Sequence, residues 1–321
     1  MRDLNPETTA LLTTGLRDSA LKALAALTQV IVGKDSHVRR ALAVLLSGGH
    51  LLLEDLPGVG KTTLARGLAL VLGGRFQRVQ GTNDLLPSDL LGAQLWDARE
   101  QIFRFQPGPV FANVLLLDEL NRIGPKTQSA LLEVMVEGQV TMDHATHPLP
   151  DPFFVIATQN PTDHAGTFPL PESQMDRFAA VLHLGYPPPE AERRILKGEA
   201  GSVALDSLEM AMSPADWAAA KRAVRQVNAS DAVLGYIERV VERIRNAGGF
   251  CSTRAISQWL ALAKAEAWLQ GLSYVTPDHL QATLSDTMAH RGRMDDRVLN
   301  RQDRRHILEN VIAEVPVGWK P

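Results

Sequence analysis

The chain has 321 residues, of which 45% are hydrophobic and 21% are charged, and these values are typical of a globular protein with about two domains. The net charge is −3, with 15 basic against 19 acidic residues in 1–189 and 18 against 17 in 190–321. Neither half has the basic excess of a typical nucleic-acid-binding protein. The single cysteine excludes an internal disulfide. Without a signal-peptide core or a bilayer-length apolar stretch, the sequence predicts a cytoplasmic protein with no membrane insertion.

The first part of the chain is predicted to form two helices, a strand and a third helix. Amphipathic patterns extend over residues 11–30 and 34–47. The apolar run 51–53 stops at a glycine-rich turn, which fits a buried parallel strand, and residues 62–72 continue as a helix that ends at two glycines.

Three further apolar runs, at residues 114–117, 153–156 and 179–184, are predicted to be strands. A helix predicted over residues 125–137 separates the first two of them. Strands that alternate with helices favour a parallel sheet covered by helices on both faces. The fold class predicted for this part of the chain is therefore α/β.

The composition changes at the three consecutive prolines 187–189, which neither a helix interior nor a central strand tolerates. Beyond them every clear pattern is helical, including a capping box at Ser213 and Asp216. One predicted helix has an apolar stripe formed by Val233, Leu234, Ile237, Val240, Val241 and Ile244. We expect an N-terminal helical lead-in (1–30), an α/β core (31–187) and an all-helical domain (188–321).

A phosphate-binding loop is predicted between the first strand and the helix after it. This loop and the start of the helix comprise Pro57, Gly58, Val59, Gly60, Lys61, Thr62 and Thr63. The glycines allow backbone N–H groups to face phosphates, Lys61 would reach the β- and γ-phosphates, and the Thr62 hydroxyl would bind Mg²⁺. The full pattern has a glycine where this chain has Asp55, which adds negative charge and tolerates unusual backbone angles poorly. An ordinary glycine-rich turn is the alternative interpretation.

Two carboxylates follow the apolar run 114–117. Ligands of parallel sheets bind at the carboxyl ends of the strands, so Asp118 is predicted to hold Mg²⁺ and Glu119 to polarise the attacking water. The alternative is an acidic strand end, which is common on protein surfaces. After the next apolar run, Asn160 is predicted to orient the lytic water or to sense the γ-phosphate, and it equally fits a turn-capping residue before a proline.

At these residues the chain resembles the AAA+ superfamily, and closely its MoxR group, from about residue 32 to the C-terminus. The segments that carry the resemblance are Leu-Asp-Glu-Leu-Asn-Arg at 117–122, Lys-Thr-Gln-Ser-Ala-Leu-Leu-Glu at 126–133, Ala-Thr-Gln-Asn-Pro at 157–161 and Phe-Pro-Leu-Pro-Glu-Ser-Gln-Met-Asp-Arg-Phe at 168–178. The resemblance implies a P-loop AAA+ αβα sandwich with a parallel sheet, followed by a helical lid. It also implies hydrolysis of ATP with Mg²⁺ as the cofactor.

The resemblance further assigns roles to three residues. Asn160 looks like the sensor-1 residue, Arg177 like the arginine finger that reaches a neighbouring subunit's ATP, and Arg254 like the sensor-2 arginine of the lid. The family usually has Gly-Ala-Ser-Pro-Arg around the last of these, where this chain reads Gly-Phe-Cys-Ser-Thr-Arg at 249–254. A permanently charged, planar guanidinium suits the spread negative charge of phosphoryl transfer. A surface salt bridge is the alternative for Arg177.

Two segments, residues 92–111 and 139–151, have the patterns of hairpins inserted in the core. By resemblance they match the helix-2 insert and the pre-sensor-1 hairpin of the clade that holds MoxR, magnesium chelatase and MCM helicases. In such rings these inserts face the pore, where substrate would be gripped. Plain surface loops are the alternative.

The function implied by the resemblance is ATP-driven, chaperone-like remodelling of a protein client by a ring of identical subunits, as a hexamer, together with a partner that carries a von Willebrand factor A domain. A magnesium-chelatase-like motor subunit is one alternative. A nucleic-acid motor related to MCM helicases is another, but the predicted inserts lack the basic residues that phosphate tracking needs. A silent nucleotide-binding scaffold is weakened by the presence of both Lys61 and Glu119.

Overall fold

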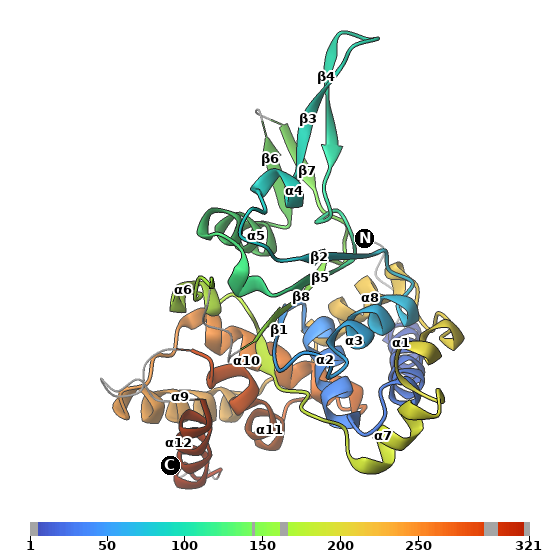
Figure 1. Ribbon diagram of the computed structural model, residues 1–321. Helices are drawn as coiled ribbons and strands as arrows, with labels where there is room; N and C mark the ends of the chain where they lie inside the picture. Colours follow the sequence, from blue (N-terminus) through green and yellow to red (C-terminus); the bar gives the residue numbers. More distant parts are fainter. Residues whose placement is uncertain (1–5, 143–144, 161–165, 292–300, 318–321) are drawn as a thin grey trace.

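The computed structural model describes residues 6–142, 145–160, 166–291 and 301–317. At its centre is a parallel five-stranded sheet with the order β2-β5-β8-β1-β9 (Figure 1). In chain order its strands are β1 (Leu51–Glu54), β2 (Phe76–Gln80), β5 (Val114–Asp118), β8 (Phe154–Gln159) and β9 (Ala180–Leu182). The predicted α/β class and parallel sheet are thus confirmed.

Strand β2 was not predicted from the sequence. It lies at the edge of the sheet and pairs with β5 alone. Its sequence, Phe-Gln-Arg-Val-Gln, has only two apolar residues, and none of its residues is fully buried. An edge strand that is open to solvent carries a weak apolar signal, whereas β1 and β5 are buried along their whole length.

The alternation of side chains along each strand divides the apolar interior into two cores. Leu51 and Leu53 pack in one core, and Leu52 packs in the other. The first core lies under α1 (Pro6–Val30), α2 (Asp35–Ser47) and α3 (Lys61–Val71), and the second lies under α5 (Pro125–Glu137). The predicted coverage of both faces is confirmed.

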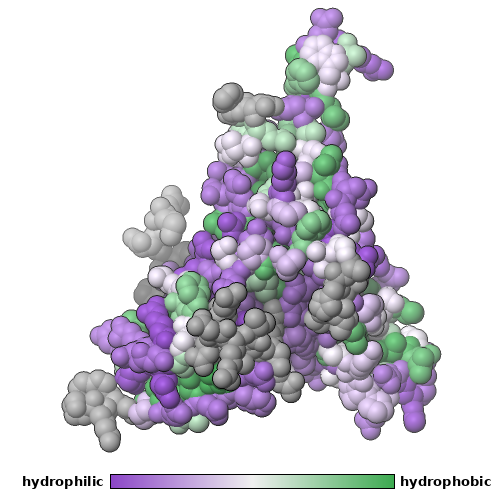
Figure 2. Space-filling model, turned by 60° about the vertical axis from the view of Figure 1, so that its left-hand side comes forward, coloured by the Kyte–Doolittle hydropathy of each residue, from purple (hydrophilic) through white to green (hydrophobic). Residues whose placement is uncertain are grey.

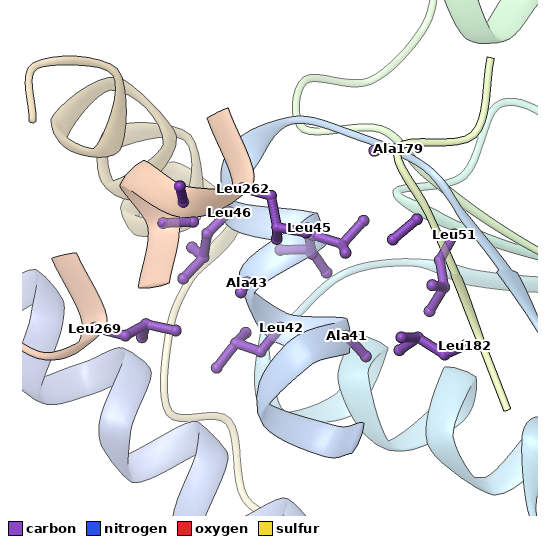
Figure 3. Close-up of a cluster of buried hydrophobic side chains, with 14 of the residues drawn as sticks. Ala41, Leu42, Ala43, Leu45, Leu46, Leu51, Ala179, Leu182, Leu262 and Leu269 are labelled. Atoms are coloured by element: carbon purple, nitrogen blue, oxygen red, sulfur yellow. The ribbon is translucent and has the colours of Figure 1, made fainter. Parts of the chain in front are cut away.

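Helix α2 joins the sheet to the helical part of the chain. Its leucines contact Leu51 and Leu182 of the sheet on one side and Leu262 and Leu269 of α10 (Thr253–Leu269) on the other (Figure 3). Beside this apolar contact lies a buried charge cluster, in which Glu266 accepts hydrogen bonds from Arg39 Nε at 2.9 Å and from Arg40 Nη1 at 2.7 Å. The core and the helical part are therefore held together by both apolar and ionic contacts.

The helical part contains α7 (Pro189–Leu196), η2 (Gly201–Ser207), α8 (Pro214–Arg225), α9 (Asp231–Asn246), α10, α11 (Pro277–Met288) and α12 (Arg301–Glu314). The predicted capping box is confirmed, because Ser213 Oγ accepts from Asp216 N at 3.1 Å and the carboxylate of Asp216 accepts from Ser213 N at 3.1 Å. The apolar stripe of α9 is corrected at one position: Leu234 is 38% exposed, since it lies about 100° around the helix from its buried neighbour Val233.

Both predicted hairpins are present. One consists of β3 (Gly92–Asp97) and β4 (Ile102–Pro107), and the other of β6 (Gln139–Met142) and β7 (Ala145–Pro148), with residues 143 and 144 between them outside the described residues. They project together from the end of the molecule above α5 (Figure 1). The ring of Phe105 stacks on that of His147 at 4.0 Å and joins the two hairpins. Among the described residues, no helix has the length and apolarity needed to cross a membrane.

Candidate nucleotide site

The predicted phosphate loop connects β1 to α3. Gly58 and Gly60 have φ angles of +84° and +97°, in the left-handed region that side chains with a Cβ disfavour. A Cβ added at either glycine would meet no atom within 4 Å, so the loop backbone faces open space. Gly60 is the N-cap of α3, whose first N–H groups and positive dipole end suit an anion. The loop therefore fits a phosphate group.

The ammonium of Lys61 lies within this loop. Lys61 Nζ donates to the carbonyl oxygens of Asp55 at 2.6 Å and Leu56 at 3.2 Å. Burial lowers the pKa of Lys61, and the carboxylates of Asp55, Asp118 and Glu119 oppose this shift. Because neutral carbonyl groups hold the ammonium, its charge is available for a phosphate.

Asp55 has a structural role that explains its departure from the glycine pattern. Its backbone has no positive φ, since Gln101 and Glu119 are the only non-glycine residues with positive φ in the part of the chain that the structure describes. Its buried carboxylate accepts hydrogen bonds from the backbone N–H groups of Leu184 and, at 3.0 Å, Gly185. Asp55 thus ties the start of the phosphate loop to the segment after β9.

The two predicted carboxylates lie at the carboxyl end of β5. Asp118 is buried, and its Oδ2 accepts from Arg78 Nε at 2.7 Å. Its Oδ1 accepts from the Thr158 hydroxyl at 3.3 Å, and the same hydroxyl accepts from Glu119 N at 3.0 Å. Thr158, on the neighbouring strand β8, therefore fixes the positions of both acidic residues.

Glu119 has an unusual backbone conformation. Its φ of 58° and ψ of 52° lie in the left-handed region, which costs a non-glycine residue about 1–3 kcal/mol. Its carboxylate accepts from Gln80 Nε2 at 2.9 Å and lies 3.1 Å from Arg122 Nε. Such strain persists where the surrounding structure imposes it, and here it turns the carboxylate out at the end of the strand.

The order of the strands brings most of the predicted site residues together. Strands β5, β8 and β1 are adjacent and parallel, so their carboxyl ends lie side by side. Asp118 ends β5, Asn160 directly follows β8, and the loop that contains Lys61 follows β1. Thr62 and Thr63 lie in the first turn of α3, beside this same edge of the sheet. The structure therefore places a phosphate loop, two carboxylates and an amide side chain along one edge.

Arg177 and Arg254 lie at the opposite, amino edge of the sheet, where the strands begin. Arg177 follows α6 (Glu172–Met175) and precedes β9, and the next residue but one, Ala179, donates its N–H to the carbonyl of His50 at 2.8 Å, just before β1. A strand rises about 3.3 Å per residue, so the four residues of β1 put roughly 13 Å between this segment and the phosphate loop. Arg254 Nη1 lies 3.6 Å from Asp176 Oδ2 at the same edge. In Figure 1, α6 and α3 lie to either side of β1.

Four residues that contact the predicted acidic pair were not identified from the sequence as doing so: Arg78, Gln80, Arg122 and Thr158. The first two lie on the edge strand β2, whose sequence gives little indication of a strand. In a parallel sheet, the helix after one strand normally leads to another strand of the same sheet. A strand is therefore expected between α3 and β5, and this expectation would have located Arg78 and Gln80. Thr158 was only part of a resembling segment, and its contacts with both acidic residues depend on the register of β8 and β5.

Comparison with known proteins agrees with this geometry. A family model described as "ATPase family associated with various cellular activities (AAA)" matches residues 50–180, and a model of the AAA lid domain matches residues 242–311. The uncharacterised protein YeaC of Bacillus subtilis is 43% identical over 273 residues, which cover 84% of this chain and 85% of the relative. Chaperone MoxR1 of Mycobacterium tuberculosis is 38% identical over 282 residues, 84% of this chain and 74% of the relative.

Among solved structures, that of a candidate ATPase from Cytophaga hutchinsonii is similar over 97% of this chain and 98% of its own length, with a TM-score of 0.87 and 32% identity. The fold, the phosphate loop and both matched domains define an ATP-hydrolysing AAA+ ATPase with a lid domain. Within this class, the chain belongs to the MoxR family. The resemblance inferred from the sequence is confirmed, and the roles of the individual site residues remain predictions.

The structural role of Asp55 can be tested by substitution. We expect Asp55→Ala to lower the free energy of unfolding by about 1–3 kcal/mol, because the buried N–H of Leu184 and the partly buried N–H of Gly185 lose their acceptor. Asp55→Asn keeps an acceptor oxygen and should lose less. The measurement is urea unfolding of the nucleotide-free protein, and an Asp55→Ala variant as stable as the wild type would contradict this role.

Proposed function

We propose that this protein is a cytoplasmic, ring-forming ATPase that uses Mg²⁺-dependent ATP hydrolysis to remodel or mature a protein client, in the manner of a chaperone. The observation that supports this proposal best is the division of the predicted site between two edges of one sheet. Lys61 and Glu119 lie at the carboxyl edge, whereas Arg177 lies at the amino edge. One subunit therefore has both halves of a site but holds them apart.

At the carboxyl edge, the backbone N–H groups of the loop and the N-terminus of α3 would hold the phosphates, and Lys61 would contact the β- and γ-phosphates. Thr62 and Asp118 are the residues that would hold Mg²⁺, since hydroxyl and carboxylate oxygens are its preferred ligands. Bound Mg²⁺ neutralises phosphate charge. Glu119 would accept a proton from the attacking water, and Asn160 would orient that water or the γ-phosphate.

The amino edge would complete the site of a neighbouring subunit. A head-to-tail contact between the edge with Arg177 and the edge with Lys61 is heterologous, and such a contact forms a ring when the rotation from one subunit to the next closes. We propose a homohexamer in which Arg177 and Arg254 face the ATP of the next subunit. Because ATP then lies between subunits, nucleotide should promote assembly by mass action.

The projecting hairpins are proposed to contact the client in the pore. At the tip of the first hairpin Trp96 and Phe103 are 54% and 67% exposed, and their rings meet edge to face at 5.1 Å. Figure 2 shows hydrophobic residues beside hydrophilic ones on this projection at the top of the molecule. Such a surface suits an exposed apolar segment of a protein. A relative that is named a chaperone supports a protein client, and a partner with a von Willebrand factor A domain is proposed from the family resemblance.

The first prediction from this proposed function concerns the roles of Glu119 and Lys61 in ATP hydrolysis. Glu119→Gln should keep ATP binding and lose hydrolysis, because the phosphate loop remains while the water loses its base. Lys61→Ala should lose ATP binding itself. Nucleotide titration and phosphate release measured on both variants distinguish the two effects. Turnover by Glu119→Gln at the wild-type rate would show that the base has been assigned wrongly.

A second prediction concerns the trans arrangement. Arg177→Ala alone should be nearly inactive, since an arginine supplied in trans contributes on the order of 10³-fold to turnover. Lys61→Ala alone should be nearly inactive as well, because it loses ATP binding. Mixed under conditions of subunit exchange, they should recover activity, because the Lys61→Ala subunit supplies an intact finger to the intact nucleotide site of its neighbour. Phosphate release is measured against the mixing ratio.

The matched control for this experiment is Arg194→Ala. Arg194 is an exposed arginine of α7 whose guanidinium lies 4.0 Å from Glu199, and we expect its loss to leave turnover unchanged. If no mixing ratio restores activity in rings that are demonstrably mixed, Arg177 does not act on a neighbouring subunit.

A third prediction separates this function from a nucleic-acid motor. Binding to single- or double-stranded DNA at physiological salt should be weak or undetectable, because Arg104 at the hairpin tip is paired with Asp97 and Glu100. Fluorescence anisotropy with labelled DNA, with and without ATP, is the measurement. A sub-micromolar affinity that depends on ATP would favour the helicase-like alternative.

A further inference from the structure

The backbone around Arg177 is held by side chains of the helical lid. The carbonyl oxygens of three consecutive residues, Asp176, Arg177 and Phe178, each accept a hydrogen bond from a lid residue. Arg291 Nη2 donates to Phe178 O at 2.7 Å and to Asp176 O at 3.4 Å, and Gln258 Nε2 donates to Arg177 O at 3.4 Å. Gln258 Oε1 also accepts from Arg291, so the two lid side chains support each other.

The carboxylate of Asp176 is a second attachment. Ser252 Oγ donates to its two oxygens at 2.9 and 3.1 Å, Arg291 Nε lies 3.3 Å from Oδ1, and Arg254 Nη1 lies 3.6 Å from Oδ2. Asp176 and Arg291 are 8% and 2% exposed. Burial lowers the pKa of Arg291 to about 10, against the opposing effect of Asp176, so the guanidinium stays charged at neutral pH. The core segment and the lid are thus joined by a buried ion pair.

The side chain of Arg177 is partly buried. Within the described ranges its guanidinium forms no ion pair, and its Nε is buried without a hydrogen-bond partner. The side chain on each side of it in the sequence, by contrast, is anchored: Asp176 by the lid, and Phe178 in the core, where it is fully buried. The anchored residues on each side therefore fix the position of the backbone from which the Arg177 side chain extends.

We infer that Asp176, Gln258 and Arg291 are positioning residues for Arg177, so that the lid of one subunit sets the geometry of the finger that acts on the next. This inference rests on the proposed function of Arg177 in trans. Loss of one attachment leaves Arg177 and the phosphate loop chemically intact but allows the finger segment to shift. A misplacement of about 1 Å lowers turnover by about 100-fold when geometry is critical.

The experiment uses Gln258→Leu and Asp176→Asn in the full chain. We expect each to lower kcat about 10- to 100-fold. The affinity of the subunit's own site for ATP should remain close to the wild-type value, because neither residue contacts the phosphate loop. Mixed with Lys61→Ala subunits, each variant should recover activity, since the Lys61→Ala subunit supplies a correctly held finger. Mixed with Arg177→Ala subunits, neither should recover, because every finger in the ring is then defective.

Glu266→Gln is the matched control, because it removes a similarly buried charge between lid and core without touching residues 176–178. It should keep a kcat near that of the wild type. If Asp176→Asn fails to fold because Arg291 loses its partner, Gln258→Leu decides the question, since it removes no charge.

The outcomes separate the inference from the function on which it rests. Wild-type kcat for Gln258→Leu and Asp176→Asn would overturn the inference. So would a lowered kcat that Lys61→Ala subunits do not restore, because the defect would then lie in the variant's own nucleotide site. In both cases recovery by the mixture of Arg177→Ala and Lys61→Ala subunits would leave the trans function of Arg177 standing. Failure of that mixture in mixed rings would overturn the proposed function itself.

Discussion

The parallel pairing of β5, β8 and β1 is the constraint on which the site depends. Because the three strands run in one direction, everything that follows them in the chain emerges at one edge of the sheet. The phosphate loop, the acidic pair and Asn160 come from segments more than 40 residues apart, and only this pairing makes them neighbours. The Thr158 hydroxyl lies within hydrogen-bond distance of both acidic residues, and these contacts depend on the register between β5 and β8.

The same constraint separates Arg177 from the phosphate loop. A residue that precedes β9 must lie at the amino edge, because β9 is parallel to β1. The sheet therefore has a nucleotide-facing edge and an arginine-bearing edge, and a head-to-tail arrangement of subunits would bring unlike edges together. A single structural feature, the common direction of the strands, thus accounts both for the groups that meet at one edge of the sheet and for the distance of Arg177 from them.

The lid contacts both the body of the subunit and the segment that carries Arg177. Its helix α10 packs against α2, and Glu266 on that helix binds two arginines of α2 in a buried cluster. At the other end of the same helix, Ser252 and Gln258 reach the segment that carries Arg177. One rigid helix therefore connects the body of the subunit to its arginine-bearing edge.

Much of this protein could be predicted from local sequence patterns. The apolar runs of β1, β5 and β8 and the capping box at Ser213 are signals that lie within a few residues, and each was confirmed. The edge strand β2 was missed, because a strand open to solvent needs few apolar residues. Leu234 was included in the apolar stripe of α9, yet it lies at the margin of the stripe and is 38% exposed, because the pattern of a helix does not fix where its buried face ends.

The sequence by itself determined the class of fold and the chemical groups of the site, because residue type and short spacing decide whether a loop can hold a phosphate or a strand can be buried. Only the tertiary structure decided which groups meet. Asp55 departs from the loop pattern in the sequence, yet in the fold it caps the backbone of Leu184 and Gly185. Asp176 has no evident role in the sequence, yet it joins the lid to the segment that carries Arg177. These contacts join residues about 75 to 130 positions apart, and no local pattern encodes them because they arise when separate elements pack.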